Sequence, residues 1–317
     1  MVGELSLQLK GKTRGMNNAK IASFLAAQVK KHPVLAELLN QVTRQTYGNK
    51  VVFLDYPVNP SQRWSSSNPH SELWDIINGN RPTYIELLKS FLAFQENFVT
   101  IPERQTADSS PLEPAWINGW MPALDGVALY SLIAIKRPKY FLEVGSGNST
   151  KFARKAITDH RLNTKIISID PHPRIEIDML CDQVIREPVE AVSLDIFDRL
   201  ESGDILYVDN SHRVFMNSDA TVIFLDVIPR LKQGVLVEIH DVMLPHDYPT
   251  VWIDRFYSEQ YLLAAYLLAR GHRIDILLPN AFISGDNELN KILTPLWRDA
   301  RMKNVETHGV SFWFRIN

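Results

Sequence analysis

The spacing of apolar residues changes near residue 110 of the chain. Before it, apolar positions recur every three or four residues in Asn18–Tyr47 and Thr83–Phe98, which is typical of amphipathic helices. The short apolar run Val51–Leu54 allows a strand, and the three prolines within Ile101–Pro114 indicate a linker. We therefore expect a mainly helical N-terminal region over residues 1–110, followed by a second domain over residues 111–317.

After residue 115, short apolar runs alternate with helical stretches. The predicted strands are Tyr140–Val144, Lys165–Ile169, Gln183–Arg186, Asp204–Val208, Gly234–Ile239, Arg273–Leu278 and Ser311–Ile316. The predicted helices are Ser149–Asp159, Val189–Phe197, Ser218–Leu231 and Ser258–Ala269. This alternation predicts the α/β class, with a doubly wound, mostly parallel sheet. Ligands of such sheets bind beyond the carboxyl ends of the strands. The residues that directly follow each strand are therefore the candidates for binding and catalysis.

A glycine-rich turn follows the first predicted strand. Gly145 and Gly147 allow a sharp turn and close approach of a ligand, and Asn148 or Ser149 can cap the next helix. Thr150 stands where a dinucleotide-binding fingerprint has its third glycine. Asp170 follows the second strand and could accept hydrogen bonds from ribose hydroxyls. The alternatives are a plain strand-to-helix turn and a solvated loop aspartate.

The fourth and fifth strands also end in ionisable residues. Asp209 and His212 follow one, and His240 and Asp241 follow the other. Asp209, His240 and Asp241 could hold a divalent ion, and His212 could be a general base. Alternatively, these side chains only satisfy backbone groups at the strand ends.

Composition and charge exclude several classes of protein. The net charge of −2 argues against a nucleic-acid binder that relies on bulk positive charge. The single cysteine, Cys181, excludes an internal disulfide and a CxxC metal site. The longest apolar run, Tyr261–Ala269, is far shorter than the roughly 20 residues of a membrane helix. With no signal peptide visible, we expect a cytoplasmic protein that does not enter a membrane.

These motifs together resemble the class I S-adenosylmethionine-dependent methyltransferases. The likeness is to a bacterial group with the motifs E-V-G-S-G-x-S-T, V-D-x-S-H and H-D, here at residues 143–150, 208–212 and 240–241. It extends over Trp116–Asn317 and implies a Rossmann-like methyltransferase sheet whose last strand is antiparallel. The cofactor-binding residues that the resemblance implies are Glu143, Gly145, Ser146, Gly147, Ser149, Thr150, Asp170, Glu187 and Asp209.

Related metal-dependent sugar and catechol O-methyltransferases imply further roles. By position, Asp209, His240 and Asp241 would hold magnesium, and Asp209 and His212 would be catalytic, His212 as the general base. His240 replaces a carboxylate, so manganese or iron would suit the site equally. Asn210 replaces the glycine that is usual after Asp209.

The resemblance implies transfer of a methyl group from S-adenosylmethionine to oxygen of a small polar or saccharide acceptor. We expect His246, Asp247 and Tyr248, after the fifth strand, to contact this acceptor, although a rigid polar loop explains them equally. One rival hypothesis is a nicotinamide-dependent oxidoreductase, against which the missing third glycine argues. Another is a non-catalytic cofactor-binding scaffold. The N-terminal helices could form a dimer surface, giving a homo-oligomer, or cover the substrate.

Overall fold

A computed structural model describes Lys20, Ser23, residues 26–27, 29, 31, 33–47, 51, 56, 58–174, 176–269 and 274–317. Its contacts divide the chain into two units, residues 1–60 and 61–317. In the first unit, helix α3 spans Pro33–Tyr47, inside the predicted helical stretch. The start of that stretch and most of the predicted strand at 51–54 lie outside the described residues.

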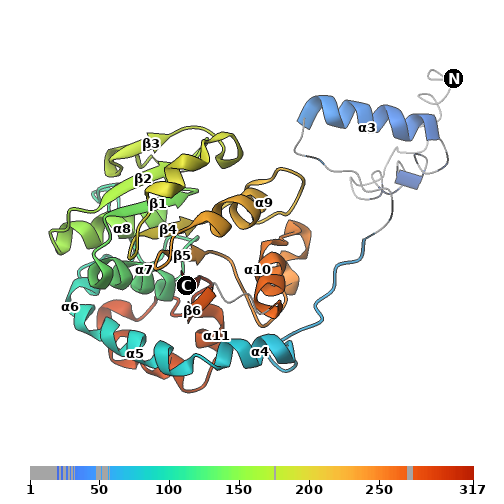
Figure 1. Cartoon of the computed structure of the whole chain (residues 1–317). Helices are drawn as coiled ribbons and strands as arrows, with labels where there is room; N and C mark the ends of the chain where they lie inside the picture. Colours follow the sequence, from blue (N-terminus) through green and yellow to red (C-terminus); the bar gives the residue numbers. More distant parts are fainter. Residues whose placement is uncertain are drawn as a thin grey trace. The chain divides into compact units, whose positions relative to one another are not determined.

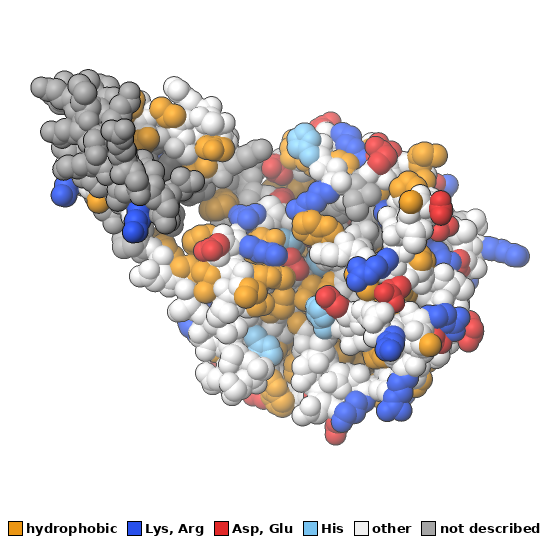
Figure 2. Space-filling model, turned by 180° about the vertical axis from the view of Figure 1, so that it is seen from behind, with side chains coloured by type: hydrophobic (Ala, Val, Ile, Leu, Met, Phe, Trp, Pro, Cys, Tyr) orange, Lys and Arg blue, Asp and Glu red, His pale blue; other side chains and the backbone are white. Residues whose placement is uncertain are grey.

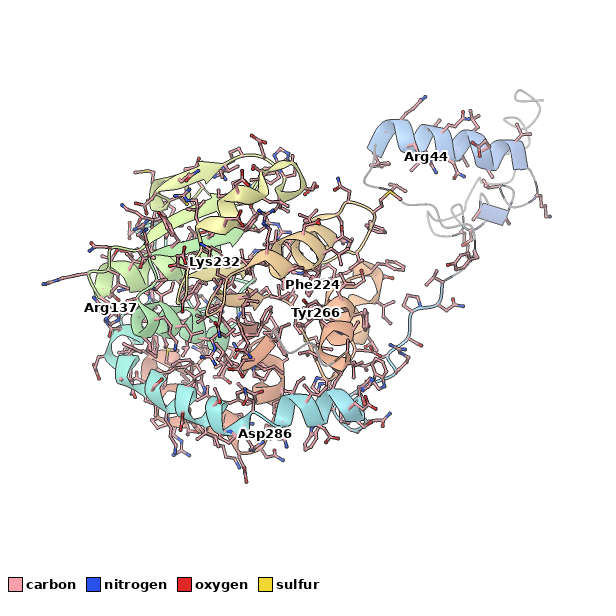
Figure 3. The ribbon with its side chains drawn as sticks, viewed as in Figure 1. Arg44, Arg137, Phe224, Lys232, Tyr266 and Asp286 are labelled. Atoms are coloured by element: carbon pink, nitrogen blue, oxygen red, sulfur yellow. The ribbon has the colours of Figure 1, made fainter. Side chains whose placement is uncertain are left out.

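The boundary predicted at residue 110 is wrong, because residues 61–110 pack into the second unit. This segment forms α4 (Ser71–Asn78), α5 (Arg81–Phe91) and α6 (Gln95–Phe98), which run along one side of the unit (Figure 1). Their apolar side chains are buried in the same core as the sheet: Leu73, Ile77, Tyr84, Leu88, Phe91 and Phe98. Asp286, which Figure 3 labels next to α4 and α5, accepts two hydrogen bonds of 2.7 Å from Arg81 at the start of α5. The N-terminal helices predicted from residue 83 onward therefore belong to the sheet domain.

The second unit is built on a seven-stranded sheet with the order β3-β2-β1-β4-β5-β7-β6. Its strands are β1 Tyr140–Val144, β2 Lys165–Ile169, β3 Gln183–Ile185, β4 Ile205–Val208, β5 Leu236–Ile239, β6 Ile274–Pro279 and β7 Phe312–Ile316. β7 is antiparallel to both of its neighbours, and the other pairs are parallel. One register row aligns Glu143, Tyr207, Glu238 and Trp313 across the centre of the sheet. The predicted α/β class and all seven strands are confirmed, while Arg273 lies outside the described residues.

The helices predicted between the strands are confirmed in part. α8 (Asn148–Asp159) and α10 (Glu259–Leu268) match their predictions closely. The stretch predicted over 218–231 begins as α9 (Asp219–Val222) and continues as a π-helix and a 3₁₀ turn. The stretch predicted over 189–197 consists of two 3₁₀ turns, Val189–Ala191 and Leu194–Arg199.

The sequence analysis missed α7, Ala123–Lys136, which packs against α8 and α5. Twelve of its 14 residues are buried, so it shows no polar face. A helix that is apolar all round gives no amphipathic periodicity, which explains why spacing did not reveal it. The short helices α11 (Asn280–Gly285) and α12 (Thr294–Trp297) were missed as well.

No helix among the described residues combines the length and apolar character needed to cross a membrane. On the face drawn in Figure 2, Lys and Arg side chains are interspersed with Asp and Glu. That face therefore shows no extended field of positive charge such as a nucleic-acid backbone would attract.

Candidate active site

The candidate site is a cavity of about 400 Å³ beyond the carboxyl ends of β1, β2, β4 and β5. Its walls include Gly145 and Ser146 after β1, Asp170 after β2, Asp209 and His212 after β4, and His240 and Asp241 at the end of β5. The sheet thus brings together most of the residues that the motifs singled out. This position is where parallel α/β sheets bind ligands.

Gly145 permits the close approach of β1 to β4 at the cavity floor. Its φ is +81°, and a β-carbon there would lie 1.8 Å from the carbonyl oxygen of Asp209. Gly147 differs, because a β-carbon on it would meet no atom within 4 Å. The first glycine is therefore required by backbone packing, whereas the second leaves open space above the loop.

Glu143 holds the loop in place from inside the fold. It is fully buried and accepts hydrogen bonds from Ser149 Oγ at 3.0 Å and Thr150 Oγ1 at 2.5 Å. Thr150 Oγ1 in turn accepts one from the backbone N–H of Gly147 at 3.1 Å. Burial raises the pKa of Glu143 to about 8, although these hydrogen bonds act to lower it. Glu143 and Thr150 thus organise the loop and do not line the main cavity.

Asp170 lines the cavity with its carboxylate already oriented by the backbone. It accepts hydrogen bonds from Ser146 N–H at 2.9 Å and His172 N–H at 2.8 Å. Glu187 is exposed and is not among the lining residues; Glu190 lines the wall instead. The structure therefore places Asp170 where it was expected and does not place Glu187 at the cavity.

His212 lies between carboxylates on both sides of its ring. Its Nε2 is 3.2 Å from Asp209 Oδ1 and 3.6 Å from Asp241 Oδ2, while its Nδ1 is 3.0 Å from Glu259 Oε2. His212 and Asp241 both have left-handed backbones, with φ of 58° and 54°. Such conformations are uncommon for residues other than glycine and often occur at functional sites.

The ring of His240 also lies between carboxylates. Its Nδ1 is 3.8 Å from Asp209 and 3.6 Å from Asp241, and its Nε2 is 3.6 Å from the buried Asp125. Asp125 also accepts hydrogen bonds from Asn280 Nδ2 and from two backbone N–H groups that precede β7. Two imidazoles thus connect a cavity-facing pair of carboxylates to buried carboxylates behind them.

The charges of this cluster depend on one another. Burial alone would raise the pKa of Asp209, but His240 and His212 hold it at about 2. Burial opposes the charged form of both histidines, yet the surrounding carboxylates raise their pKa values well above the usual range. Burial raises the pKa of Asp241 and of Glu259. The surrounding carboxylates therefore favour the protonated form of both imidazoles.

The predicted metal site is not supported. Among the described residues, no group of three or more His, Cys, Asp or Glu side chains is arranged to hold a metal ion. The oxygens of Asp209 and Asp241 are directed at imidazole nitrogens, which compensate their charge.

The predicted acceptor contacts at residues 246–248 lie outside the cavity lining. Asp247 is buried and accepts hydrogen bonds from the backbone N–H groups of Arg63 and Trp64 and from Tyr261 Oη. Tyr248 Oη accepts one from Gln260 N–H at 3.3 Å, and the carbonyl of His246 accepts another from Gln260 Nε2. These residues anchor the N-terminal segment and α10, which was the alternative left open for them.

Several site residues were not predicted from the sequence. Glu259 contacts His212, and Trp252, Arg255 and Tyr257 line the cavity, but the sequence analysis assigned none of them to the site. Glu259 lies 47 residues after His212, so no local spacing connects them. Only the tertiary fold brings these side chains together.

Residues 142–242 match the family model described as a methyltransferase domain. The matched segment includes the glycine loop, Asp170, Asp209, His212, His240 and Asp241. The seven-stranded sheet, with β7 antiparallel, is the methyltransferase Rossmann-like arrangement that the resemblance implied. No curated protein matches the chain.

The chain is also similar to solved structures at low identity. A methyltransferase of Podospora anserina bound to SAH is 16% identical, with a TM-score of 0.38, over 61% of this chain and 77% of that one. An O-methyltransferase of Bacillus cereus in complex with SAH is 13% identical, with a TM-score of 0.32, over 73% and 90%. The plantazolicin methyltransferase BpumL in complex with SAH is 11% identical, with a TM-score of 0.39, over 78% and 99%.

Proposed function

We propose that the protein transfers a methyl group from S-adenosylmethionine to a hydroxyl of a small polar acceptor. The observation that supports this most is the shared cavity. It joins the glycine loop and Asp170, which suit a nucleoside, to the Asp209–His212 cluster, which suits proton transfer. The domain family adds to this support.

The residues around the loop fit the cofactor. Asp170 would accept hydrogen bonds from the ribose, and Ile169 and Val189 give an apolar wall for the adenine. A smaller adjoining cavity is lined by Gly147, Asn148, Trp120 and Arg174, next to the N-terminus of α8. Free N–H groups and a guanidinium there suit the carboxylate of the methionine part. Bound S-adenosylmethionine would supply a methyl group activated by its sulfonium.

The acceptor would bind beside Asp209, His212 and Asp241. Its oxygen would form the new bond to the methyl carbon as the carbon–sulfur bond breaks, with the electron pair passing to sulfur. His212 would take the proton from the hydroxyl, and Glu259 on its other nitrogen would stabilise the resulting imidazolium. Because the carboxylates favour protonated His212, the reactive neutral form increases as pH rises above the usual histidine range.

The nicotinamide-dependent alternative has less support. Thr150, in place of the third glycine, bonds through its hydroxyl to both Glu143 and Gly147. In a dinucleotide-binding fingerprint this position is a glycine, which has no side chain.

Titration calorimetry with S-adenosylhomocysteine and with NAD, in EDTA, tests the proposal. We expect S-adenosylhomocysteine to bind and NAD not to bind. The Asp170→Ala variant should bind at least about tenfold more weakly, because it loses hydrogen bonds to the ribose. Glu187→Gln is the matched control and should bind like the natural protein, since its side chain is exposed away from the cavity. Binding of NAD alone would overturn the proposal.

A further inference from the structure

An aromatic wall lines part of the cavity. Trp252 and Tyr257 are half-buried, with ring centroids 5.8 Å apart, and both line the cavity. The Arg255 guanidinium lies 4.2 Å from the centroid of Trp252 and 5.5 Å from that of Tyr257. The Arg213 guanidinium also lies 5.2 Å from the Tyr257 centroid, but Arg213 is not among the residues that line the cavity. The wall therefore combines two flat apolar surfaces with the positive charge of Arg255 at the cavity.

Arg255 has no acidic partner among the described residues. Its guanidinium contacts the two aromatic rings, and no ion pair joins it to a described carboxylate. The positive charge at this wall is thus available to a ligand. This differs from Arg81, whose guanidinium is taken up by Asp286 and Glu288.

The wall is attached directly to the reactive cluster. The N–H of Ser258 donates to the carbonyl of His212 at 2.8 Å, and Ser258 Oγ accepts from Val214 N–H at 2.9 Å. The Nε of Arg213 donates to the carbonyl of Arg255 at 3.0 Å. These bonds fix the backbone of residue 255 relative to His212.

The spacing along the wall suits one particular kind of ligand. The ring of Tyr257 is 4.7 Å from the imidazole of His212 and 5.5 Å from the Arg255 guanidinium. The Tyr257 ring therefore contacts both the proposed base and the cation of Arg255. A ligand that lies against Tyr257 can therefore present a hydroxyl to His212 and an anion to Arg255.

We propose that the acceptor is a hydroxylated six-membered ring that carries a carboxylate, bound with its ring against Trp252 and Tyr257 and its carboxylate on Arg255. This inference rests on the proposed function and specifies its substrate class. A guanidinium pairs well with a carboxylate, and the aromatic faces accept either a sugar ring or an aromatic ring. A sugar acid and an aromatic hydroxy acid share this chemistry.

The test measures binding of four probes to the full-length protein saturated with S-adenosylhomocysteine, by calorimetry and saturation-transfer NMR. The probes form two matched pairs, glucuronate with glucose and 4-hydroxybenzoate with 4-hydroxybenzamide. We expect one acid to bind at least about tenfold more tightly than its neutral partner. The preferred acid identifies the source as a saccharide or an aromatic compound.

Arg255→Gln should abolish the preference, Arg255→Lys should keep part of it, and both should bind S-adenosylhomocysteine normally. Arg298→Gln removes an equal charge at an exposed position outside the cavity lining and should keep the full preference. Equal affinity within both pairs, no binding of either acid, or a preference that persists in Arg255→Gln would overturn the inference. Failure of the natural protein to bind S-adenosylhomocysteine is a separate result, which counts against the proposed function.

Discussion

The carboxylate of Glu259 lies 3.0 Å from Nδ1 of His212, while Asp209 lies 3.2 Å from Nε2 of the same ring. Asn210 Nδ2 donates to the other oxygen of Glu259 at 2.8 Å, so this carboxylate is itself held in place. Glu259 is buried and does not line the cavity, so it would act on a ligand through His212 and Asn210, which do. It is a positioning residue in the proposed mechanism.

His212→Asn should lower methyl transfer by about 10²- to 10⁴-fold, because it removes the proposed general base. S-adenosylhomocysteine affinity should stay within a few fold of the natural value. Release of S-adenosylhomocysteine during turnover of an acceptor, together with calorimetry, measures both. Unchanged turnover would exclude His212 as the base.

Glu259→Gln should move the pH dependence of methyl transfer toward lower pH. In the natural protein Asp209 and Glu259 raise the pKa of His212, so we expect turnover to rise above the ordinary histidine range. With one carboxylate neutralised, that pKa falls and the rising limb of kcat/KM shifts with it. The pH profiles of the two proteins measure the shift, and identical profiles would show that Glu259 has no electrostatic effect on the base.

Gly145→Ala should destabilise the domain and weaken S-adenosylhomocysteine binding, because the new β-carbon would lie 1.8 Å from the Asp209 carbonyl oxygen. We expect a loss of about 1–3 kcal/mol or more in the free energy of unfolding. Gly147→Ala is the matched control, since its β-carbon meets no atom within 4 Å. Thermal unfolding of both variants gives the comparison, and equal melting temperatures would contradict the role of Gly145.

Glu143→Gln should become more stable relative to the natural protein as pH rises from 5 to 8. The pKa of Glu143 is raised to about 8 in the folded chain, chiefly by burial, so folding favours the neutral carboxyl. Its stabilising contribution is complete below the unfolded pKa and is lost as pH rises toward 8, by about 1.4 kcal/mol per pH unit. Glutamine keeps the shape without this loss. Denaturant unfolding at several pH values measures it, and a difference that does not grow with pH would contradict it.

The strands and the motif residues at their ends could be predicted from sequence for a physical reason. Buried parallel strands are short apolar runs, and the residues after them share one edge of the sheet. The sequence pattern therefore identified four cavity residues together: Gly145, Asp170, Asp209 and His212. The uniformly apolar α7 has no periodic pattern of polar residues, so it was not predicted.

The acceptor side could not be predicted in the same way. Asp247 looked available for a ligand, but its carboxylate binds backbone N–H groups 183 and 184 residues away in the chain. Arg255 and Trp252 face the cavity because the segment that contains them is bonded to residues 212–214. Contacts over such separations leave no periodic or local trace in the sequence.

The two halves of the cavity are separate in the order of the chain. The residues proposed to hold the cofactor occur before residue 191, except Asp209, which the resemblance assigns to both halves. The residues of the reactive cluster and of the aromatic wall occur from residue 209 onward, apart from Asp125 behind His240. The aromatic wall, Trp252 to Tyr257, is a short segment between β5 and α10 that adds no strand to the sheet. Exchanging this segment alone would alter which molecules are methylated while the donor half stays intact, so acceptor choice can diverge among descendants of such a protein without new donor binding having to evolve.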